Sequence, residues 1–178
     1  MSLLLSENLT ESAATDPSPQ EAPLKFYLHP GMVFTSAQAH AVTTILGSCI
    51  AVCLWDPIAR MGGINHFLLP AWNGEGEASA RFGDVAIREL ITRIAAVGCD
   101  QRHLQAKIFG GACVLDAFQH RRTHLGAQNS DFAKRVLRQE GIPLVGEDIG
   151  GRKGRKLIFH THDGTVWVKQ LLKIDNGH

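Results

Sequence analysis

The sequence predicts a single α+β (mixed α/β) domain, in which a mostly antiparallel or mixed β-sheet is flanked by at least two helices. Three observations predict this class. Short runs rich in β-branched and apolar residues fill the first half of the chain. An amphipathic helix with strands on both sides follows, and a second helix precedes a hairpin signal. Helices and strands do not alternate regularly, as they would in a doubly wound parallel sheet.

The composition restricts the class of protein. The chain has 178 residues, of which 44% are hydrophobic and 20% are charged, as in ordinary folded domains. It carries 18 basic and 17 acidic residues, so its net charge gives no reason to expect a nucleic-acid partner. No run approaches the roughly 20 apolar residues of a membrane helix. We therefore expect neither nucleic-acid binding nor membrane insertion.

Residues 1–23 predict a flexible leader, because no apolar period follows Leu5 and polar residues and prolines take its place. Residues 24–178 are expected to form a single folded domain. The leader lacks the basic start and the roughly 7–15 apolar residues of a secretory signal, which predicts a cytoplasmic protein. In that compartment cysteines are expected to be reduced thiols. The chain has four: Cys49, Cys53, Cys99 and Cys113.

Short apolar runs bounded by turn signals predict the strands of the first half. These strands are expected over residues 24–28, 39–46, 49–55 and 62–69. The second and third are separated only by Gly47 and Ser48, so Cys49 lies at a junction between two extended runs.

Hydrophobic periodicity predicts two helices in the second half. The first is expected to be capped by Asp84 and to end at Gly98. Its apolar face follows helical spacing through Ile87, Leu90, Ile91 and Ile94. The second helix is expected to be capped by Asn129 or Ser130, after a polar loop over residues 113–128.

The remaining strands lie around these helices. They are predicted over residues 105–109, 142–145, 157–162 and 165–171. Asp163-Gly164 separates the last two, and this dipeptide between extended runs is a strong hairpin signal. The basic run RKGRK, residues 152–156, is interpreted as a solvated turn.

Cys49 and His66 are the first candidates for a reactive site. Gly47, two residues before Cys49, allows close backbone approach and exposes neighbouring N–H groups, so a thiol there can meet a substrate. His66 follows seventeen residues later in an apolar run, and pairing of the two runs would bring the side chains within hydrogen-bond reach. A histidine beside a cysteine stabilises the nucleophilic thiolate. The alternative is a small core cysteine and a hydrogen-bonded core histidine.

A threonine is the candidate third member of this site, since a hydroxyl or carbonyl can fix the tautomer of the imidazole. Thr43 precedes Cys49 by six residues, so regular pairing would place both on one face. Thr44 is an equally good candidate on the other face, and Gly47 interrupts the alternation. Periodicity alone does not choose between them, and a plain strand-forming threonine is the alternative interpretation.

A metal site is a further alternative. Cys49-x3-Cys53 resembles half of a zinc site, but no second cysteine pair has the matching spacing. His160 and His162 are two residues apart and would share a strand face. They are interpreted as an exposed hairpin face. The sequence thus predicts no metal and no cofactor.

The run TTILGSCIAVCLWDPIARMGGINHFLLP, residues 43–70, resembles the signature of the CheD family. Members of this family are chemoreceptor glutamine deamidases of bacterial chemotaxis. The resemblance continues in RFGDVAIRELI (81–91), in KIFGGA (107–112) and in the C-terminal half of the chain. It covers about residues 25–171, which is most of the chain expected to be ordered.

The resemblance implies which residues act. The catalytic cysteine of the family falls on Cys49, its histidine on His66, and its threonine on Thr43 rather than on the neighbouring threonine. The site would resemble that of the cytotoxic necrotizing factor toxins, which also deamidate glutamine in proteins. The glycine and asparagine of the GxxN segment of the family fall on Gly126 and Asn129.

The resemblance also implies a function. It is a hydrolase activity on side-chain amides, which converts specific glutamines on the cytoplasmic helices of methyl-accepting chemoreceptors to glutamate. The route is a Cys49–His66 thioester mechanism, with glutamyl methylesterase activity as a second outcome and the Cys49 backbone N–H as candidate oxyanion donor. A CheC-type phosphatase is a further implied partner. The alternative is a non-catalytic adaptor that binds a receptor or a chemotaxis phosphatase, but the intact Cys49, His66 and Thr43 argue against it.

Overall fold

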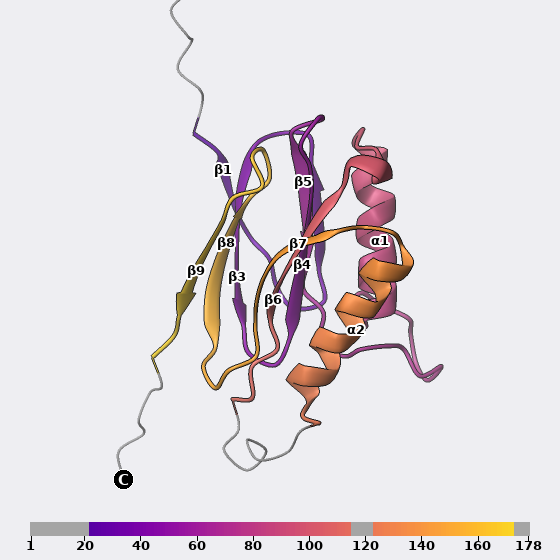
Figure 1. Cartoon of the computed structure of the whole chain (residues 1–178), viewed down its shortest axis with the longest axis vertical. Coiled ribbons are helices and arrows are strands. Elements are labelled where there is room, and N and C mark those ends of the chain that lie inside the picture. The colour runs from indigo at the N-terminus through magenta and orange to yellow at the C-terminus, as the bar shows by residue number, and fades with distance from the viewer. Residues whose placement is uncertain (1–21, 115–122, 173–178) are drawn as a thin grey trace, which may run out of the picture.

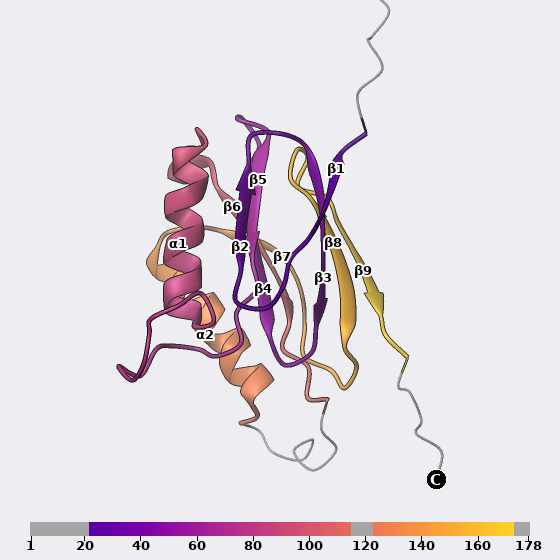
Figure 2. The same cartoon turned by 180° about the vertical axis from the view of Figure 1, so that it is seen from behind.

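The computed structural model describes residues 22–114 and 123–172, which fold into three layers. A four-stranded sheet faces a five-stranded sheet, and two helices cover the other side of the five-stranded sheet (Figures 1 and 2). The predicted single α+β domain is thereby confirmed. Residues 1–21 of the expected leader and 115–122 of the expected polar loop lie outside the described residues.

The four-stranded sheet has the order β1-β3-β8-β9. Its strands are β1 (Leu24–Tyr27), β3 (His40–Leu46), β8 (Arg155–His160) and β9 (Val166–Gln170). β1 runs parallel to β3, and the other pairs are antiparallel. The predicted hairpin is present as β8–β9. Its turn contains Gly164 at φ +72°, a conformation that favours glycine.

The five-stranded sheet has the order β2-β5-β4-β6-β7. Its strands are β2 (Val33–Ser36), β5 (Met61–Asn65), β4 (Ile50–Asp56), β6 (Gln105–Gly110) and β7 (Leu144–Ile149). Only β6 and β7 pair in parallel, so the sheet is mixed. The sequence did not predict β2.

Among the described residues, two α-helices and one short 3₁₀ helix complete the fold. They are α1 (Gly83–Ala96), η1 (Gln101–His103) and α2 (Leu125–Gln139). Both predicted helix caps need correction. Phe82 caps α1 without a side-chain hydrogen bond, and Asp84 lies inside the first turn. His124 caps α2 by accepting the N–H of Ala127 at 3.1 Å, which places Asn129 within the helix rather than at its start.

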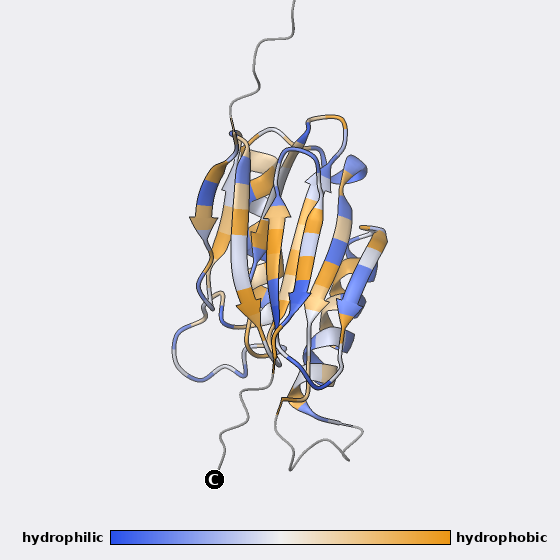
Figure 3. Ribbon diagram, turned by 90° about the vertical axis from the view of Figure 1, so that its left-hand side faces the viewer, coloured by the Kyte–Doolittle hydropathy of each residue, from blue (hydrophilic) through white to orange (hydrophobic). Residues whose placement is uncertain are grey.

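The core is divided into two parts by the five-stranded sheet. One part lies between this sheet and the helices, and the other lies between the two sheets. Figure 3 shows the four-stranded sheet from outside, with hydrophobic and hydrophilic residues alternating along its strands. In β3 the alternation buries Val42, Thr44 and Leu46 between the sheets. The polar Thr44 is therefore enclosed among apolar neighbours, where its hydroxyl requires a hydrogen-bond partner.

None of the described helices is long and apolar enough to cross a membrane.

Candidate active site

Cys49 lies where the chain passes from one sheet to the other. β3 ends at Leu46 in the four-stranded sheet, and β4 begins at Ile50 in the five-stranded sheet. Gly47, Ser48 and Cys49 therefore form a short connection, which we call the sheet junction. Cys49 is partly exposed there, whereas the other three cysteines are buried.

Backbone hydrogen bonds hold the sheet junction from the side of β6. The carbonyl of Gly47 accepts the N–H of Ala112 and the carbonyl of Cys49 accepts the N–H of Gly111, both at 2.8 Å. Gly110 has φ +111°, and a Cβ on it would lie only 2.1 Å from the Cys49 oxygen. Glycine is therefore required at this position. The Gly110-Gly111 pair lets this part of the chain approach the sheet junction closely.

The strand pairing places Cys49 and His66 on one face. Ile50 and Phe67 form an antiparallel bridge with hydrogen bonds of 3.1 and 3.0 Å. Extending that register by one residue sets His66 opposite Ala51, which shares a face with Cys49 because side chains alternate. Cys49 and His66 are thus diagonal neighbours, a relation with Cα atoms roughly 7–8 Å apart. The side chains of a cysteine and a histidine can span that separation.

The two ring nitrogens of the buried His66 have different environments. Its Nδ1 lies 2.8 Å from the hydroxyl oxygen of Thr44, and that hydroxyl donates to the carbonyl of Leu28 at 2.8 Å. A hydroxyl has one proton, so Thr44 must accept from the Nδ1–H of His66. Nε2 then carries the lone pair, and it is buried without a hydrogen-bond partner among the described residues. It is therefore the basic atom of the ring.

The threonine that contacts His66 in the structure is Thr44, whereas the resemblance named Thr43. Thr44 is fully buried between the sheets, while Thr43 lies on the other face of β3. The expectation for Thr43 came from the family resemblance, and strand alternation between Thr43 and Cys49 agreed with it. Because β3 and β4 belong to different sheets, the alternation is not carried through the intervening junction.

Burial keeps both members of the Cys49–His66 pair neutral in the free protein. It raises the pKa of the Cys49 thiol, with a smaller opposing effect from the backbone N–H of the same residue. It lowers the pKa of His66 to about 4. Both shifts disfavour a standing thiolate–imidazolium pair. The structure therefore differs from the expectation that His66 maintains a thiolate, because the pair loses too much hydration to stay charged.

Asn129 links the two chain segments that carry Cys49 and His66. It is fully buried in α2. Its side-chain amide donates to the carbonyl of Ser48 at 3.0 Å and to that of Leu68 at 2.9 Å. The sequence placed Asn129 in a GxxN segment but gave no indication of these long-range contacts.

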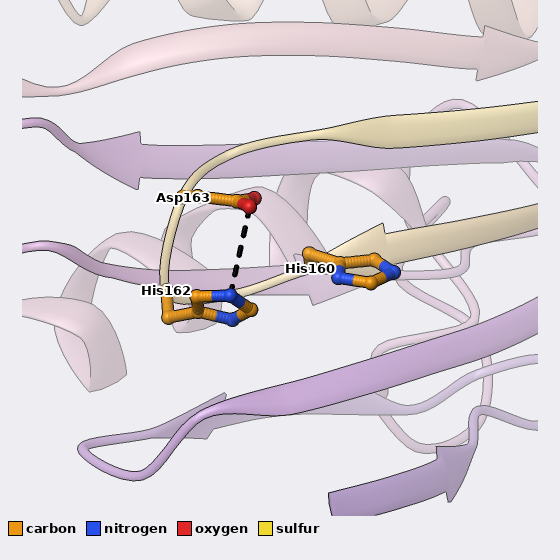
Figure 4. Close-up of side chains that lie close together, drawn as sticks. All are labelled: His160, His162 and Asp163. Carbon is orange, nitrogen blue, oxygen red and sulfur yellow. Dashed lines mark ion pairs between the residues drawn. The ribbon is translucent and has the colours of Figure 1, made fainter. Parts of the chain in front are cut away.

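One group of described side chains could hold a metal, and it lies away from the sheet junction. His160, His162 and Asp163 offer ligand atoms that all lie within 4.8 Å of one another at the β8–β9 turn (Figure 4). β8 pairs His160 with the start of β3 and Arg155 with its end. The cluster therefore lies near the start of β3, whereas Cys49 follows its end. Figure 1 shows β3 and β8 side by side.

Comparison with known proteins shows which family this chain resembles. A family model described as CheD chemotactic sensory transduction matches residues 68–170. A protein of Anaeromyxobacter dehalogenans strain 2CP-C, named probable chemoreceptor glutamine deamidase CheD 1, is 50% identical over 145 residues. That alignment covers 82% of this chain and 84% of the relative.

Two further relatives carry the name probable chemoreceptor glutamine deamidase CheD. One from Trichlorobacter lovleyi is 43% identical over 142 residues, covering 80% of this chain and 88% of the relative. One from Sulfurimonas denitrificans is 38% identical over 151 residues, covering 85% and 97%. The family-model match begins just after His66, so it includes Asn129 and leaves the Cys49–His66 pair to be argued from geometry.

Proposed function

The chain belongs to the CheD family, and from this premise we propose that it is a cytoplasmic protein-glutamine deamidase. Its substrates are glutamine side chains on the cytoplasmic helices of chemoreceptors, which it converts to glutamate. The observation that carries the proposal is the hydrogen-bonded series from Leu28 through Thr44 to His66. It leaves Nε2 of His66 as a free base on the face that also bears Cys49.

Attack on the amide begins from the neutral pair. The Cys49 sulfur forms a bond to the amide carbon while its proton passes to Nε2 of His66. The electron pair of the C=O bond moves to oxygen and gives a tetrahedral oxyanion. His66 becomes an imidazolium, whose Nδ1–H stays bonded to Thr44. Thr44 thus acts as a positioning residue that keeps one tautomer and one ring orientation.

Collapse of the intermediate releases ammonia. The oxyanion reforms the C=O bond, the C–N bond breaks, and the Nε2 proton moves to the departing nitrogen. The thioester on Cys49 is then attacked by water, which gives its proton to the neutral His66. Cleavage of the C–S bond returns that proton to sulfur and frees the glutamate side chain. Glutamine and water are consumed, and glutamate and ammonia are formed.

The backbone N–H of Cys49 is the oxyanion donor in this proposal. In a trans peptide the C=O of Ser48 and the N–H of Cys49 point in opposite directions, and no cis peptide occurs among the described residues. Asn129 holds the Ser48 carbonyl toward α2, so the Cys49 N–H is directed away from α2. The influence of this N–H on the sulfur of Cys49 agrees with a donor beside the nucleophile. Asn129 is accordingly a positioning residue for the oxyanion hole.

The same intermediate supports hydrolysis of a glutamyl methyl ester. There methanol leaves in place of ammonia and accepts the same Nε2 proton. A non-catalytic adaptor, which binds a receptor or a CheC-type phosphatase, is the competing function. A buried Nε2 without a hydrogen-bond partner is costly, and an adaptor would have no use for it.

Mass spectrometry of receptor helices after incubation with the full chain tests the proposal. Each glutamine converted to glutamate should gain about one mass unit, as follows from replacing NH2 by OH. In H2(18)O the new carboxylate should carry one heavy oxygen, and added hydroxylamine should divert the thioester to a hydroxamate. The matched control is Cys53→Ala, which keeps Cys49. Receptor binding without any mass change would favour the adaptor.

A further inference from the structure

We propose that the β8–β9 turn binds a divalent transition-metal ion through His160, His162 and Asp163. This site is separate from the proposed deamidase site and does not depend on it. Each of the three residues is partly buried, so each keeps a side that solvent and an incoming ion can reach.

The first observation is the spacing of the ligand atoms. Nε2 of His162 and Oδ2 of Asp163 lie 3.5 Å apart. Ligands about 2.0–2.2 Å from a tetrahedral zinc ion are separated by about 3.4 Å, so this pair already stands at the required distance. The two imidazole rings have centroids 5.7 Å apart and are tilted by 49°. They are not stacked, and a small rotation of the His160 ring brings its nitrogen into the same shell.

The second observation is the turn, which holds the carboxylate in place. Oδ1 of Asp163 accepts the backbone N–H of Thr165 at 2.8 Å, and this leaves Oδ2 turned toward His162. Gly164 has φ +72°, and a Cβ there would lie 2.6 Å from the Trp55 ring. The backbone of the turn is thus fixed against the five-stranded sheet, and the side chain of Asp163 does not need to be ordered by the metal.

The third observation is the chemistry of the donor set. Lys107 donates to the Gly164 carbonyl at 2.7 Å, so this cation is engaged by the backbone of the turn. Two imidazoles and one carboxylate suit zinc, nickel or copper rather than magnesium or calcium. Water can complete the coordination.

The position of the site indicates what an ion would do there. It would connect the end of β8 to the turn and thereby fasten the hairpin at the edge of the four-stranded sheet. Cys49 follows the other end of β3. We therefore expect the ion to act on stability of the hairpin, with the deamidation rate unchanged.

The test is titration of the metal-free full chain with Zn²⁺ under reducing conditions, followed by calorimetry and by melting temperature. The experiment is done in a Cys49→Ala background so that the partly exposed thiol does not compete. One zinc ion per chain should bind, and the melting temperature should rise with zinc concentration. His162→Gln should weaken affinity by more than about 10-fold, since even groups outside the coordination shell cost about 10–100-fold. Asp163→Asn should also weaken it.

His29→Gln is the matched control, because this histidine lies outside the cluster. It should bind zinc as tightly as the parent protein. The proposal is overturned if His162→Gln and His29→Gln bind zinc equally, or if the parent shows no saturable site. Binding that disappears when the remaining cysteines are alkylated, with the histidines intact, would assign the zinc to thiols and would equally overturn it.

Discussion

Cys49 and Cys53 are four residues apart, yet they occupy two very different regions of the molecule. Cys53 lies within β4, opposite Ile64 on one neighbouring strand and Lys107 on the other, and is buried. Burial raises the pKa of its thiol far above the usual range. Cys49 lies in the sheet junction, outside both ladders, and is partly exposed. The passage between the sheets, rather than the residue type, makes one thiol available to a substrate.

The difference extends to the polar groups around each thiol. Inside β4 the backbone pairs with β5 on one side and with β6 on the other. At the sheet junction the carbonyls of Gly47, Ser48 and Cys49 are all bound from β6, its following loop or α2. In the proposed deamidase these carbonyl contacts fix the backbone of the sheet junction, so that the Cys49 N–H can serve as the oxyanion donor.

The largest expected effect is at Cys49 itself. Cys49→Ala should abolish deamidation and leave the melting temperature nearly unchanged, because the side chain is partly exposed and the nucleophile has no substitute. Cys53→Ala should show the reverse, with nearly full activity and a stability loss of about 1 kcal/mol from the core. Deamidation rates and denaturant unfolding of both variants check this. Residual deamidation by Cys49→Ala would remove Cys49 as the nucleophile.

The next largest effect on the deamidation rate is expected at Asn129. Asn129→Asp keeps the size of the side chain but puts a carboxylate against two carbonyl oxygens. The misdirected Cys49 N–H should cost about 100-fold in deamidation rate, as expected for small misplacements of a reacting group. Alkylation of Cys49 by iodoacetamide forms no oxyanion, so its rate should change much less.

Ser130→Ala is the control for Asn129, because Ser130 is also buried in α2 but bonds only to the Gly126 carbonyl of its own helix. It should retain normal deamidation. If alkylation and deamidation fell together in Asn129→Asp, the asparagine would be supporting the local fold rather than the oxyanion hole.

A smaller effect on the deamidation rate is expected at Thr44, with Thr43 as its control. Thr44→Val leaves the Leu28 carbonyl and His66 Nδ1 without their partner. It should slow deamidation roughly 10- to 100-fold, equivalent to about 1.4–2.7 kcal/mol. Thr43→Val changes a hydroxyl on the other face of β3 and should be nearly neutral. Comparison of kcat at saturating receptor peptide checks the pair, and equal rates would exclude Thr44 as the residue that orients the imidazole.

The sequence predicted those parts of the molecule that depend on local pattern. Periodicity located the strands around Cys49 and the helix through Leu90, and Asp163-Gly164 located the hairpin. The position of Cys49 after a glycine also indicated correctly that the thiol sits at an interruption. These features depend on neighbours within a few residues, which a sequence displays directly.

Long-range contacts were not visible in the sequence. Asn129 reaches carbonyls 81 and 61 residues away, and no local spacing encodes such a pair. Arg155, interpreted as part of a solvated turn, is buried and binds the Asp148 carboxylate at 2.6 Å and the carbonyls of Asp148 and Gly150. In both cases a polar side chain satisfies backbone groups that only the folded chain brings together.

The last prediction concerns His66, which resembles Cys53 in being buried but can gain a charge. Its pKa falls from the ordinary value of 6.5 to about 4 in the folded protein, so between these pH values the unfolded chain binds a proton that the folded chain does not. Folding stability should therefore decrease as pH falls through this window, by about 1.4 kcal/mol per pH unit. Above 6.5 both states are neutral and this contribution is absent.

Urea unfolding at several pH values between 4 and 7 can isolate this contribution by comparing the parent protein with His66→Gln. Glutamine does not titrate, so the stability difference between the two proteins should shrink toward low pH. Asp56 and Asp163, whose pKa values are lowered, also lose stability as pH falls, but they are present in both proteins and cancel in the difference. Cys53→Ala should run parallel to the parent over the same range, because that thiol is neutral in both states. Parallel curves for His66→Gln as well would mean that the imidazole is not held neutral by burial, and the proposed start from an uncharged Cys49–His66 pair would have to be abandoned.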